Sequence, residues 1–489
     1  MSNSSTLNLF SMTGKMKILH FSWIAFFITF FVWFNHAPLL GSIAASLGLT
    51  SAEVKTLLIL NVALTIPARV IIGMLTDKFG PRIVYATLLA VASVPCFAFA
   101  LSQDFAQAAI SRFLLGFIGA GFVVGIRMVS EWFPANELGT AEGIYGGWGN
   151  FGSAAAAMSL PTLALVFGGD DGWRYAVGLT GAISLVFSVI WYMNVNDTPA
   201  GSTYFKPKKI GGLAVTSKGD FYFMLVMKLP MYAALALLTW KLSPYGVSIL
   251  SDNAALAIYI SLGLILIYDC FSAYRVNKPI FVAEVPKEQR YAFKQVAVLN
   301  VLYFATFGSE LAVVSMLPLF FADVFELDMV YAGLLASAYA FMNLMSRPGG
   351  GWISDRFGRK RTLLILTAGL AAGYALMSMI DSNWPLYLAV IVAMACSFFV
   401  QAGEGAVFAV VPLIKRSLTG QIAGMTGAYG NVGAVFYLTV LSMVSYQVFF
   451  TVIAITAVLG FFALLMLEEP SGHIVEVNED GSVEMIKVS

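Results

Sequence analysis

Long apolar stretches separated by short polar segments set the pattern of the chain. Most stretches reach the roughly 20 residues that a helix needs to cross a bilayer. Twelve of them form two sets of six, at 18–40, 55–75, 83–102, 110–132, 141–167 and 174–195, and at 295–320, 330–352, 362–381, 384–409, 421–445 and 447–467. Two further apolar runs, at 221–241 and 247–271, lie between the sets. The pattern predicts an all-α polytopic membrane protein.

The composition supports this class and excludes others. Of 489 residues, 59% are hydrophobic and 11% are charged, whereas soluble domains carry about 25% charged residues. The net charge of +1 argues against a nucleic-acid partner, which would require a basic excess. Three cysteines and three scattered histidines show no metal-binding spacing, so we expect no metal, no cofactor and no enzymatic activity.

The charged loops predict the orientation in the cell membrane. Basic residues gather in alternate loops, at Lys15 and Lys17, at Lys78 and Arg82, at Lys206, Lys208, Lys209 and Lys218, at Arg356, Arg359, Lys360 and Arg361, and at Lys415 and Arg416. The opposite loops are acidic. Because basic loops stay in the cytoplasm, we expect both termini to be cytoplasmic.

The two sets of apolar runs are copies of each other. GMLTDKFGPR at 73–82 matches GWISDRFGRK at 351–360 with an offset of 278, and GTAEGIYGGWGNFG at 139–152 matches GQIAGMTGAYGNVG at 420–433 with an offset of 281. Because both charged loops lie on the cytoplasmic side, the middle segment crosses the membrane twice or not at all. The chain therefore has 14 spans, or 12 if the hairpin lies on the membrane surface.

This organisation divides the chain into four parts. They are a six-helix half at 1–195, a linker at 196–290 with the hydrophobic hairpin at about 221–271, a second six-helix half at 291–469 and a polar cytoplasmic tail at 470–489. Parallel repeats place a substrate site at their interface near the middle of the membrane. That is the architecture of an alternating-access transporter.

Two repeat-related arginines mark the expected site. Arg69 and Arg347 each lie eight residues before a loop aspartate, Asp77 and Asp355, which is about 12 Å along a helix. Two guanidinium groups facing one interface repel each other unless an anion lies between them, and the guanidinium fork suits a planar oxyanion. The alternative is that each arginine pairs with a buried acid for structural reasons.

Polar and aromatic residues accompany the arginines. Asn343 precedes Arg347 by four residues and shares its helix face. Asn150 and Asn431 are repeat-related, and Gly146 lies one turn before Asn150. On the first span of the second half, Tyr303, Phe307 and Glu310 form one stripe at spacings of four and three residues.

Buried acids are candidates for proton coupling. Glu310 and Glu404 lie deepest in the apolar runs, and a buried acid with a raised pKa can carry a proton. The alternative for Glu310 is a salt bridge, for instance with Arg127, although Arg127 and Glu131 are one turn apart and are expected to pair with each other. We expect Asp77, Arg82, Asp355 and Arg359 to lock the cytoplasmic loops between conformations.

The motifs resemble those of a known family. The paired GxxxD(K/R)xG loops resemble the signature of the major facilitator superfamily, and GGWGNFG at 146–152 with GAYGNVG at 427–433 resembles the paired signatures of its nitrate/nitrite porters, especially cyanobacterial-type permeases. This resemblance implies a major facilitator fold. It also implies that the anion-binding residues are Arg69, Arg347, Asn343, Asn150, Gly146, Tyr303, Phe307 and, counting back from Pro134, Phe122.

The resemblance implies import of nitrate and nitrite. Importing one negative charge costs about 2.3 kcal/mol per 100 mV, and Glu310 on the proposed cavity face favours proton symport over nitrate/nitrite exchange. Open alternatives are that exchanger, a carrier of another small or organic anion, an anion channel and a nutrient receptor. The expected partners are the two anions, membrane lipids and protons, for a monomeric protein.

Overall fold

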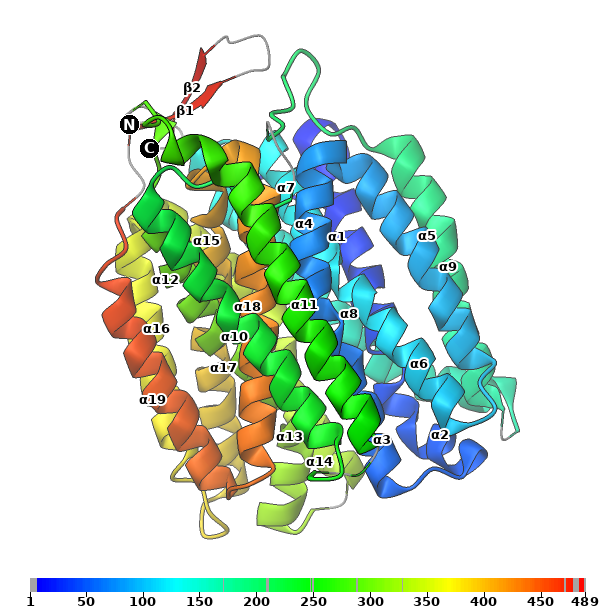
Figure 1. Cartoon of the computed structure of the whole chain (residues 1–489). Coiled ribbons are helices and arrows are strands. Elements are labelled where there is room, and N and C mark those ends of the chain that lie inside the picture. Colours follow the sequence, from blue (N-terminus) through cyan, green and yellow to red (C-terminus); the bar gives the residue numbers. More distant parts are fainter. Residues whose placement is uncertain are drawn as a thin grey trace.

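Long apolar runs fold into helices because hydrocarbon offers no partners for the backbone, so each segment satisfies its own amides and carbonyls. The computed structural model describes residues 7–169, 171–207, 211–246, 248, 250–286, 289–327, 329–469, 472–477 and 483–487. Lys208, Lys209 and parts of the tail at 470–489 lie outside these ranges. Figure 1 shows the helices as a bundle whose long axes run in roughly one direction.

Each predicted six-span half forms its own set of helices. The first half contains α1 (Gly14–Trp33), α2 (Leu40–Leu47), α3 (Ser51–Ala63), α4 (Thr65–Phe79), α5 (Pro81–Ala100), α6 (Phe105–Leu115), α7 (Gly121–Trp132), α8 (Ala135–Phe167) and α9 (Gly172–Asn194). The second half contains α12 (Phe293–Ala305), α13 (Phe307–Phe325), α14 (Met329–Phe341), α15 (Asn343–Phe357), α16 (Arg359–Met377), α17 (Leu386–Phe408), α18 (Thr419–Leu441) and α19 (Tyr446–Leu464). Short 3-10 turns occur at Ala37–Leu39, Gly116–Ala120, Lys278–Phe281, Val411–Leu413 and Arg416–Leu418.

Several predicted spans are broken in the middle. The second span splits at Leu64, between α3 and α4, and its repeat counterpart splits at Met342, between α14 and α15. These two breaks are related by the same offset of 278 that relates the loop aspartates. Pro67 explains the first, because proline cannot donate to the carbonyl of Ala63. A third break, at Thr306 between α12 and α13, divides the predicted aromatic stripe.

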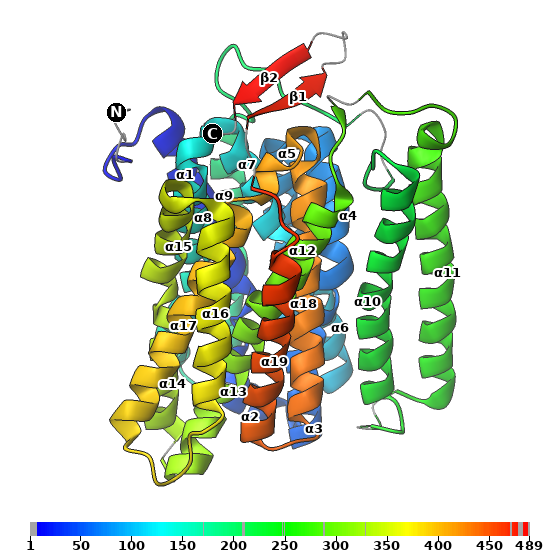
Figure 2. The same cartoon turned by 90° about the vertical axis from the view of Figure 1, so that its left-hand side faces the viewer.

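The hydrophobic hairpin consists of α10 (Lys218–Leu242) and α11 (Asp252–Asn277). Figure 2 shows both helices parallel to the bundle along its outside, with α10 nearer to it. The phenol of Tyr429 on α18 donates to the carbonyl of Met227 on α10, 2.5 Å away. A partly buried ion pair, Lys228 to Asp269 at 2.7 Å, joins the two hairpin helices.

Eleven helical stretches of the described chain are long and apolar enough to cross a membrane. They include all six spans of the first set and both helices of the hairpin. The predicted spans at 330–352, 362–381 and 421–445 are not among them. The first of these is split into two short helices and contains a buried arginine. The choice between 14 and 12 spans, and the four-part division of the chain, therefore remain predictions.

One end of the bundle carries both termini and the loops at 77–82 and 355–360 (Figures 1 and 2). We call it the basic end. The predicted polar tail contains an antiparallel pair at this end, β1 (His473–Val477) and β2 (Val483–Lys487), in which His473 is opposite Lys487. The sequence pattern does not predict these strands.

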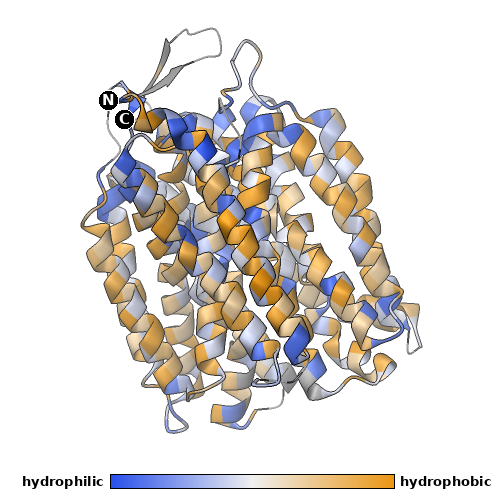
Figure 3. Ribbon diagram, viewed as in Figure 1, coloured by the Kyte–Doolittle hydropathy of each residue, from blue (hydrophilic) through white to orange (hydrophobic). Residues whose placement is uncertain are grey.

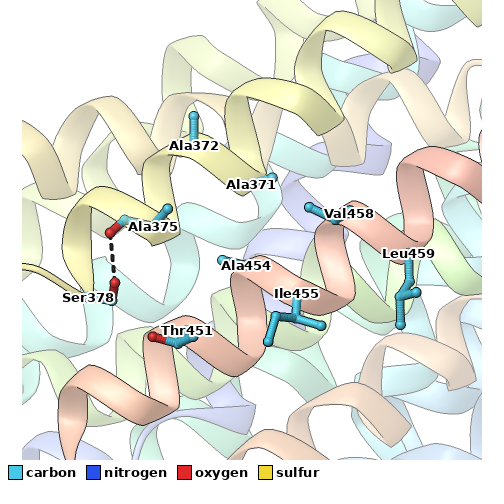
Figure 4. A pocket seen from close by; sticks show the side chains of 9 residues that line it. All are labelled: Ala371, Ala372, Ala375, Ser378, Thr451, Ala454, Ile455, Val458 and Leu459. Carbon is cyan, nitrogen blue, oxygen red and sulfur yellow. Dashed lines mark hydrogen bonds between the residues drawn. The ribbon is translucent and has the colours of Figure 1, made fainter.

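The outer surface of the bundle is largely apolar. Figure 3 shows hydrophobic residues along the lengths of the helices and hydrophilic residues concentrated near the ends. A groove between α16 and α19 (Figure 4) is lined by Ala371, Ala372, Ala375, Ser378, Thr451, Ala454, Ile455, Val458 and Leu459. It contains none of the predicted site residues, which lie between the two halves.

Candidate functional site

Arg69 on α4 and Arg347 on α15 meet at the interface of the halves. Their side chains are buried, with exposed fractions of 0% and 1%. The guanidinium carbon of Arg69 lies 5.5 Å from the ring centroid of Phe122, and that of Arg347 lies 5.2 Å from the same centroid. The structure thus brings two cations from opposite repeats to one aromatic ring.

Each arginine packs on a glycine of the opposite half. Nη1 of Arg69 donates to the carbonyl of Gly427 on α18 at 2.7 Å. A Cβ atom on Gly427 would lie 3.0 Å from Cδ of Arg69, and one on Gly146 of α8 would lie 2.5 Å from Nε of Arg347. Gly146 and Gly427 are equivalent in the two repeats. In both, the lack of a Cβ atom lets a guanidinium group lie close to a helix backbone.

The two arginines differ in their partners. Nη1 of Arg347 donates to Oε2 of Glu404 at 2.5 Å, and Nη2 donates to the phenol of Tyr303 at 3.1 Å. Arg69 donates to the backbone carbonyls of Gly119 and Gly427, and its Nη2 has no partner among the described residues. The alternative of a buried acid partner therefore holds for Arg347 and not for Arg69. Within the part of the chain that the structure describes, no acid forms an ion pair with Arg69.

Aromatic rings surround the arginines. The rings of Phe122 and Tyr303 are nearly parallel, at 6°, with centroids 6.3 Å apart. Tyr303 also stacks on Phe307 at 5.0 Å, and Arg69 lies 4.9 Å from the centroid of the Phe307 ring. Phe408, which sequence reasoning missed, meets Phe122 and Tyr303 edge-on at 4.6 and 4.8 Å.

Of the predicted proton-coupling acids, Glu404 binds Arg347 and Glu310 binds Asn343, both residues of α15. Nδ2 of Asn343 donates to Oε1 of Glu310 at 2.5 Å, and Gln401 donates to the same oxygen at 3.4 Å. Glu310 also acts electrostatically on the carboxyl of Glu404. Oε2 of Glu310 and Oε1 of Glu404 have no hydrogen-bond partner among the described residues. Gln401 is a further polar residue that the sequence patterns did not identify.

Arg127 is the partner of other acids. It binds Glu131 at 2.9 Å and lies 3.6 Å from Asp77. The suggested salt bridge between Arg127 and Glu310 is therefore wrong, and the predicted pair of Arg127 with Glu131 is present. Arg127 also donates to the carbonyl of Phe205 in the linker at 2.7 Å.

The signature asparagines are buried on equivalent helices. Asn150 on α8 is 4% exposed, and its Oδ1 has no partner among the described residues. Asn431 on α18 donates to the carbonyl of Gly427 at 3.2 Å, and its Oδ1 is likewise unpartnered. The structure shows no contact of Asn150 with either arginine within the described chain, so its assignment to the anion site remains a prediction.

The loop aspartates join the two halves at the basic end. Asp77 accepts hydrogen bonds from the backbone amides of Gly420 and Gln421 at 2.8 and 2.9 Å, near the start of α18. Asp355 accepts from those of Gly139 and Thr140 at 3.0 and 2.8 Å, near the start of α8. A carboxylate is favoured at a helix N-terminus, where amides lack partners, and Asp77 binds such amides in the first turn of α18. Asp355 binds amides in the second turn of α8, so each aspartate holds the opposite repeat.

The two predicted lock arginines differ. Arg359 reaches across the halves, because its Nη2 donates to the carbonyl of Ala135 at 2.7 Å. Arg82 stays within the first half, where its backbone amide donates to Asp197 at 2.7 Å and its Nε donates to the carbonyl of Tyr192 at 2.9 Å. Burial raises the pKa of Asp197 above its usual value. The predicted role of Arg82 in locking the loops therefore stays a prediction.

Comparisons with known proteins agree with the geometry of the site. The sequence model of the Major Facilitator Superfamily matches residues 22–282 and 299–486. The nitrate/nitrite transporter NrtP of a Picosynechococcus species is 47% identical, covering 98% of this chain and 97% of that protein. NrtP of Nostoc punctiforme is 46% identical, with 97% of each chain covered. The high affinity nitrate transporter 2.5 of Arabidopsis thaliana is 30% identical, covering 88% of this chain and 75% of that protein.

Solved structures share the fold at low identity. The human organic anion transporter MFSD10 has a TM-score of 0.61 and 14% identity, covering 92% of this chain and 100% of that chain. The proton:xylose symporter XylE has a TM-score of 0.59 and 16% identity, covering 93% and 96%. The curated relatives are transporters and not enzymes, as predicted. The chain belongs to the Major Facilitator Superfamily and, within it, to the nitrate/nitrite porter family.

Proposed function

We propose that this protein is a secondary active transporter that imports nitrate, and also nitrite, by alternating access. The observation that carries the proposal is the meeting of Arg69 and Arg347, from opposite halves, on the ring of Phe122. The names of the relatives supply the substrate class.

Charge balance at the site fits a monovalent anion. Arg69 and Arg347 contribute two positive charges, and Glu404 neutralises one of them. Among the described residues, Arg69 donates to the backbone carbonyls of Gly119 and Gly427 and forms no ion pair with an acid. The remaining single positive charge is buried, and a bound anion compensates it.

Shape adds selectivity for a planar ion. Guanidinium groups donate in their own plane and match two oxygens at once. The parallel rings of Phe122 and Tyr303 have centroids 6.3 Å apart, near twice the roughly 3.5 Å at which stacked atoms touch. A flat nitrate ion between them contacts a ring on each face, whereas a tetrahedral oxyanion does not fit such a slot.

Alternating access requires the ends to open in turn. The bonds of Asp77 and Asp355 to the opposite repeat close the basic end, which we assign to the cytoplasm. Exposed apolar side chains along α11, such as Leu264 at 62% and Ile267 at 68%, support a hairpin that crosses the membrane. That arrangement gives 14 spans with both termini in the cytoplasm.

Proton coupling is the finer part of the proposal. Moving nitrate inward against a negative potential costs about 2.3 kcal/mol per 100 mV, and the Glu310–Glu404 pair offers a proton site beside Arg347. A symporter that carries more than one proton per nitrate gains from the potential. The second candidate is a nitrate/nitrite exchanger, which moves no net charge. It is favoured only by the substrates named for the relatives.

The test is nitrate uptake by the purified full chain in proteoliposomes. One arm applies an inward proton gradient and the other supplies internal nitrite at equal pH. Accumulation driven by protons supports symport, and stimulation by nitrite alone supports exchange. The Arg69→Gln variant serves as the matched protein control, because it leaves Arg347 and Glu404 in place. Folded wild-type protein that moves no nitrate in either arm refutes the proposal and favours a carrier of another anion.

A further inference from the structure

Glu142 is a buried acid that the proposed mechanism does not use. It lies on α8, its side chain is 1% exposed, and neither carboxyl oxygen has a hydrogen-bond partner among the described residues. It follows Gly139, whose amide binds Asp355, by one turn, and it precedes Gly146, which packs on Arg347, by one turn. Glu142 is thus placed between the lock at the basic end and the anion site.

The charges around Glu142 act on it in opposite directions. Arg347 and Asp355, both on α15, are the charged groups that influence its carboxyl, and Tyr145 of its own helix is electrostatically coupled to it. Ion pairs on the neighbouring elements are those of Lys15 with Glu137, Arg127 with Glu131 and Asp77, Arg174 with Asp171, and Glu404 with Arg347. Lys17 of α1 lies over the Phe21 ring, and Arg356 of α15 lies over the Trp352 ring. His20 of α1 accepts a hydrogen bond from Trp23.

Close packing keeps this acid dry while the basic end is closed. A Cβ atom on Gly143 would lie 2.6 Å from the carbonyl oxygen of Arg347, and one on Gly351 would lie 1.8 Å from that of Gly139. Helices α8 and α15 therefore touch through their backbones on both sides of Glu142. A buried carboxylate without hydrogen bonds is strongly disfavoured, so Glu142 is neutral in this state.

Separation of α8 and α15 changes that balance. Opening the basic end breaks the bonds of Asp355 to Gly139 and Thr140 and admits water to this helix face. The carboxyl of Glu142 then loses its proton to the solution on that side, and the new carboxylate is within electrostatic reach of Arg347. The second repeat has Ala423 at the equivalent position, so an ionising acid at this position acts on Arg347 only.

We propose that Glu142 is a proton-binding site that times release of the anion: it is neutral while α8 and α15 are packed, ionises when they part, and as a carboxylate competes with the anion for Arg347. The step transfers one proton from the Glu142 carboxyl to water and breaks no other bond. The inference rests on the proposed function for the identity of the anion, and not for the titration itself.

The test uses the full chain in proteoliposomes of verified orientation, with nitrate as the probe and pH varied only on the basic-end side. Release of nitrate to that side should quicken with rising pH, by up to about tenfold per pH unit where Glu142 titrates. Glu142→Gln should remove this dependence while nitrate binding persists, and Glu142→Asp should restore it. Glu284→Gln, at an exposed ion pair, is the matched control. Wild-type pH dependence in folded Glu142→Gln protein overturns the proposal.

Infrared spectroscopy gives a second readout that needs no transport. Closed wild-type protein should show the C=O band of a protonated buried carboxyl, which shifts in Glu142→Asp. A wild-type protein without a band attributable to this residue overturns the proposal, even if Glu142→Gln fails to fold. If wild-type protein has the band but neither binds nor transports nitrate, only the proposed function is refuted, and the protonation of Glu142 stands.

Discussion

Replacing Glu404 by glutamine should strengthen nitrate binding and slow nitrate transport. In the structure, Oε2 of Glu404 lies 2.5 Å from Nη1 of Arg347. An anion that binds this guanidinium must share it with the carboxylate. Glutamine keeps an oxygen acceptor at nearly the same place and removes the negative charge, so the variant isolates the electrostatic contribution.

The magnitude follows from the charges. A nitrate ion and a carboxylate that share one guanidinium lie about 6 Å apart, and at an effective dielectric constant of about 20 they repel by about 2.8 kcal/mol. Each 1.4 kcal/mol corresponds to a factor of about ten in affinity. We therefore expect Kd to fall by about 10- to 100-fold in Glu404→Gln, with a lower uptake rate because release becomes slow.

Calorimetric titration of the purified chain with nitrate measures this change. Wild-type affinity should rise as pH falls, since protonation of Glu404 removes negative charge beside the anion, and Glu404→Gln should flatten this dependence. Removal of one partner from a buried pair destabilises proteins by about 3–5 kcal/mol, so thermal unfolding with and without nitrate is the control. Folded Glu404→Gln protein that binds nitrate no more tightly than wild type refutes the competition of Glu404 with the anion.

Three further sets of substitutions test the remaining parts of the site. Arg69→Lys and Arg347→Lys should each abolish measurable uptake in folded protein, because loss of a charge-assisted hydrogen bond of about 1.5–3 kcal/mol weakens binding; near-normal uptake in either variant contradicts a bidentate role. Glu310→Gln should uncouple nitrate uptake from the proton gradient, and unchanged pH dependence of uptake would remove Glu310 from coupling. Gly146→Ala places a Cβ atom 2.5 Å from Nε of Arg347, whereas Gly427→Ala places one 3.0 Å from Cδ of Arg69. Nitrate uptake should therefore fall further in Gly146→Ala than in Gly427→Ala. Equal or reversed losses of uptake would show that contact with these glycines does not position the guanidinium groups.

Features marked by a short motif or by the internal repeat could be predicted from the sequence. The repeat offsets placed Arg69 and Arg347 at equivalent depths, and the structure joins them at Phe122. The same offsets identified Asp77 and Asp355, which both bind backbone amides of a helix in the opposite half. Equivalent positions in two parallel repeats lie at the same depth and make equivalent contacts with the opposite half, so the repeat carried this information.

Features that depend on distant contacts could not be predicted in this way. Gln401 and Phe408 occupy an apolar run in which nothing marks them, and only the packing of α17 against the site reveals them. Arg82 is equivalent to Lys360, and Pro81 stands where the second repeat has Arg359, so the cross-half contact of Arg359 has no counterpart at Arg82, whose amide donates to Asp197. The break at Thr306 has no proline before it, and it lies between two aromatic residues that a continuous helix would have placed on one face.

The asymmetry of the acids distinguishes the two arginines. Glu404 binds Arg347, Glu310 acts electrostatically on Glu404, and Glu142 is influenced by Arg347. Among the described residues, no acid forms an ion pair with Arg69, which is held by backbone carbonyls whose charge does not change with pH. Under the proposed function, Arg69 therefore attracts the anion throughout the cycle with constant strength. Arg347 attracts it only as strongly as the protonation of its neighbours allows, so protons can be linked to anion movement through one half of the protein while the other half keeps a fixed site.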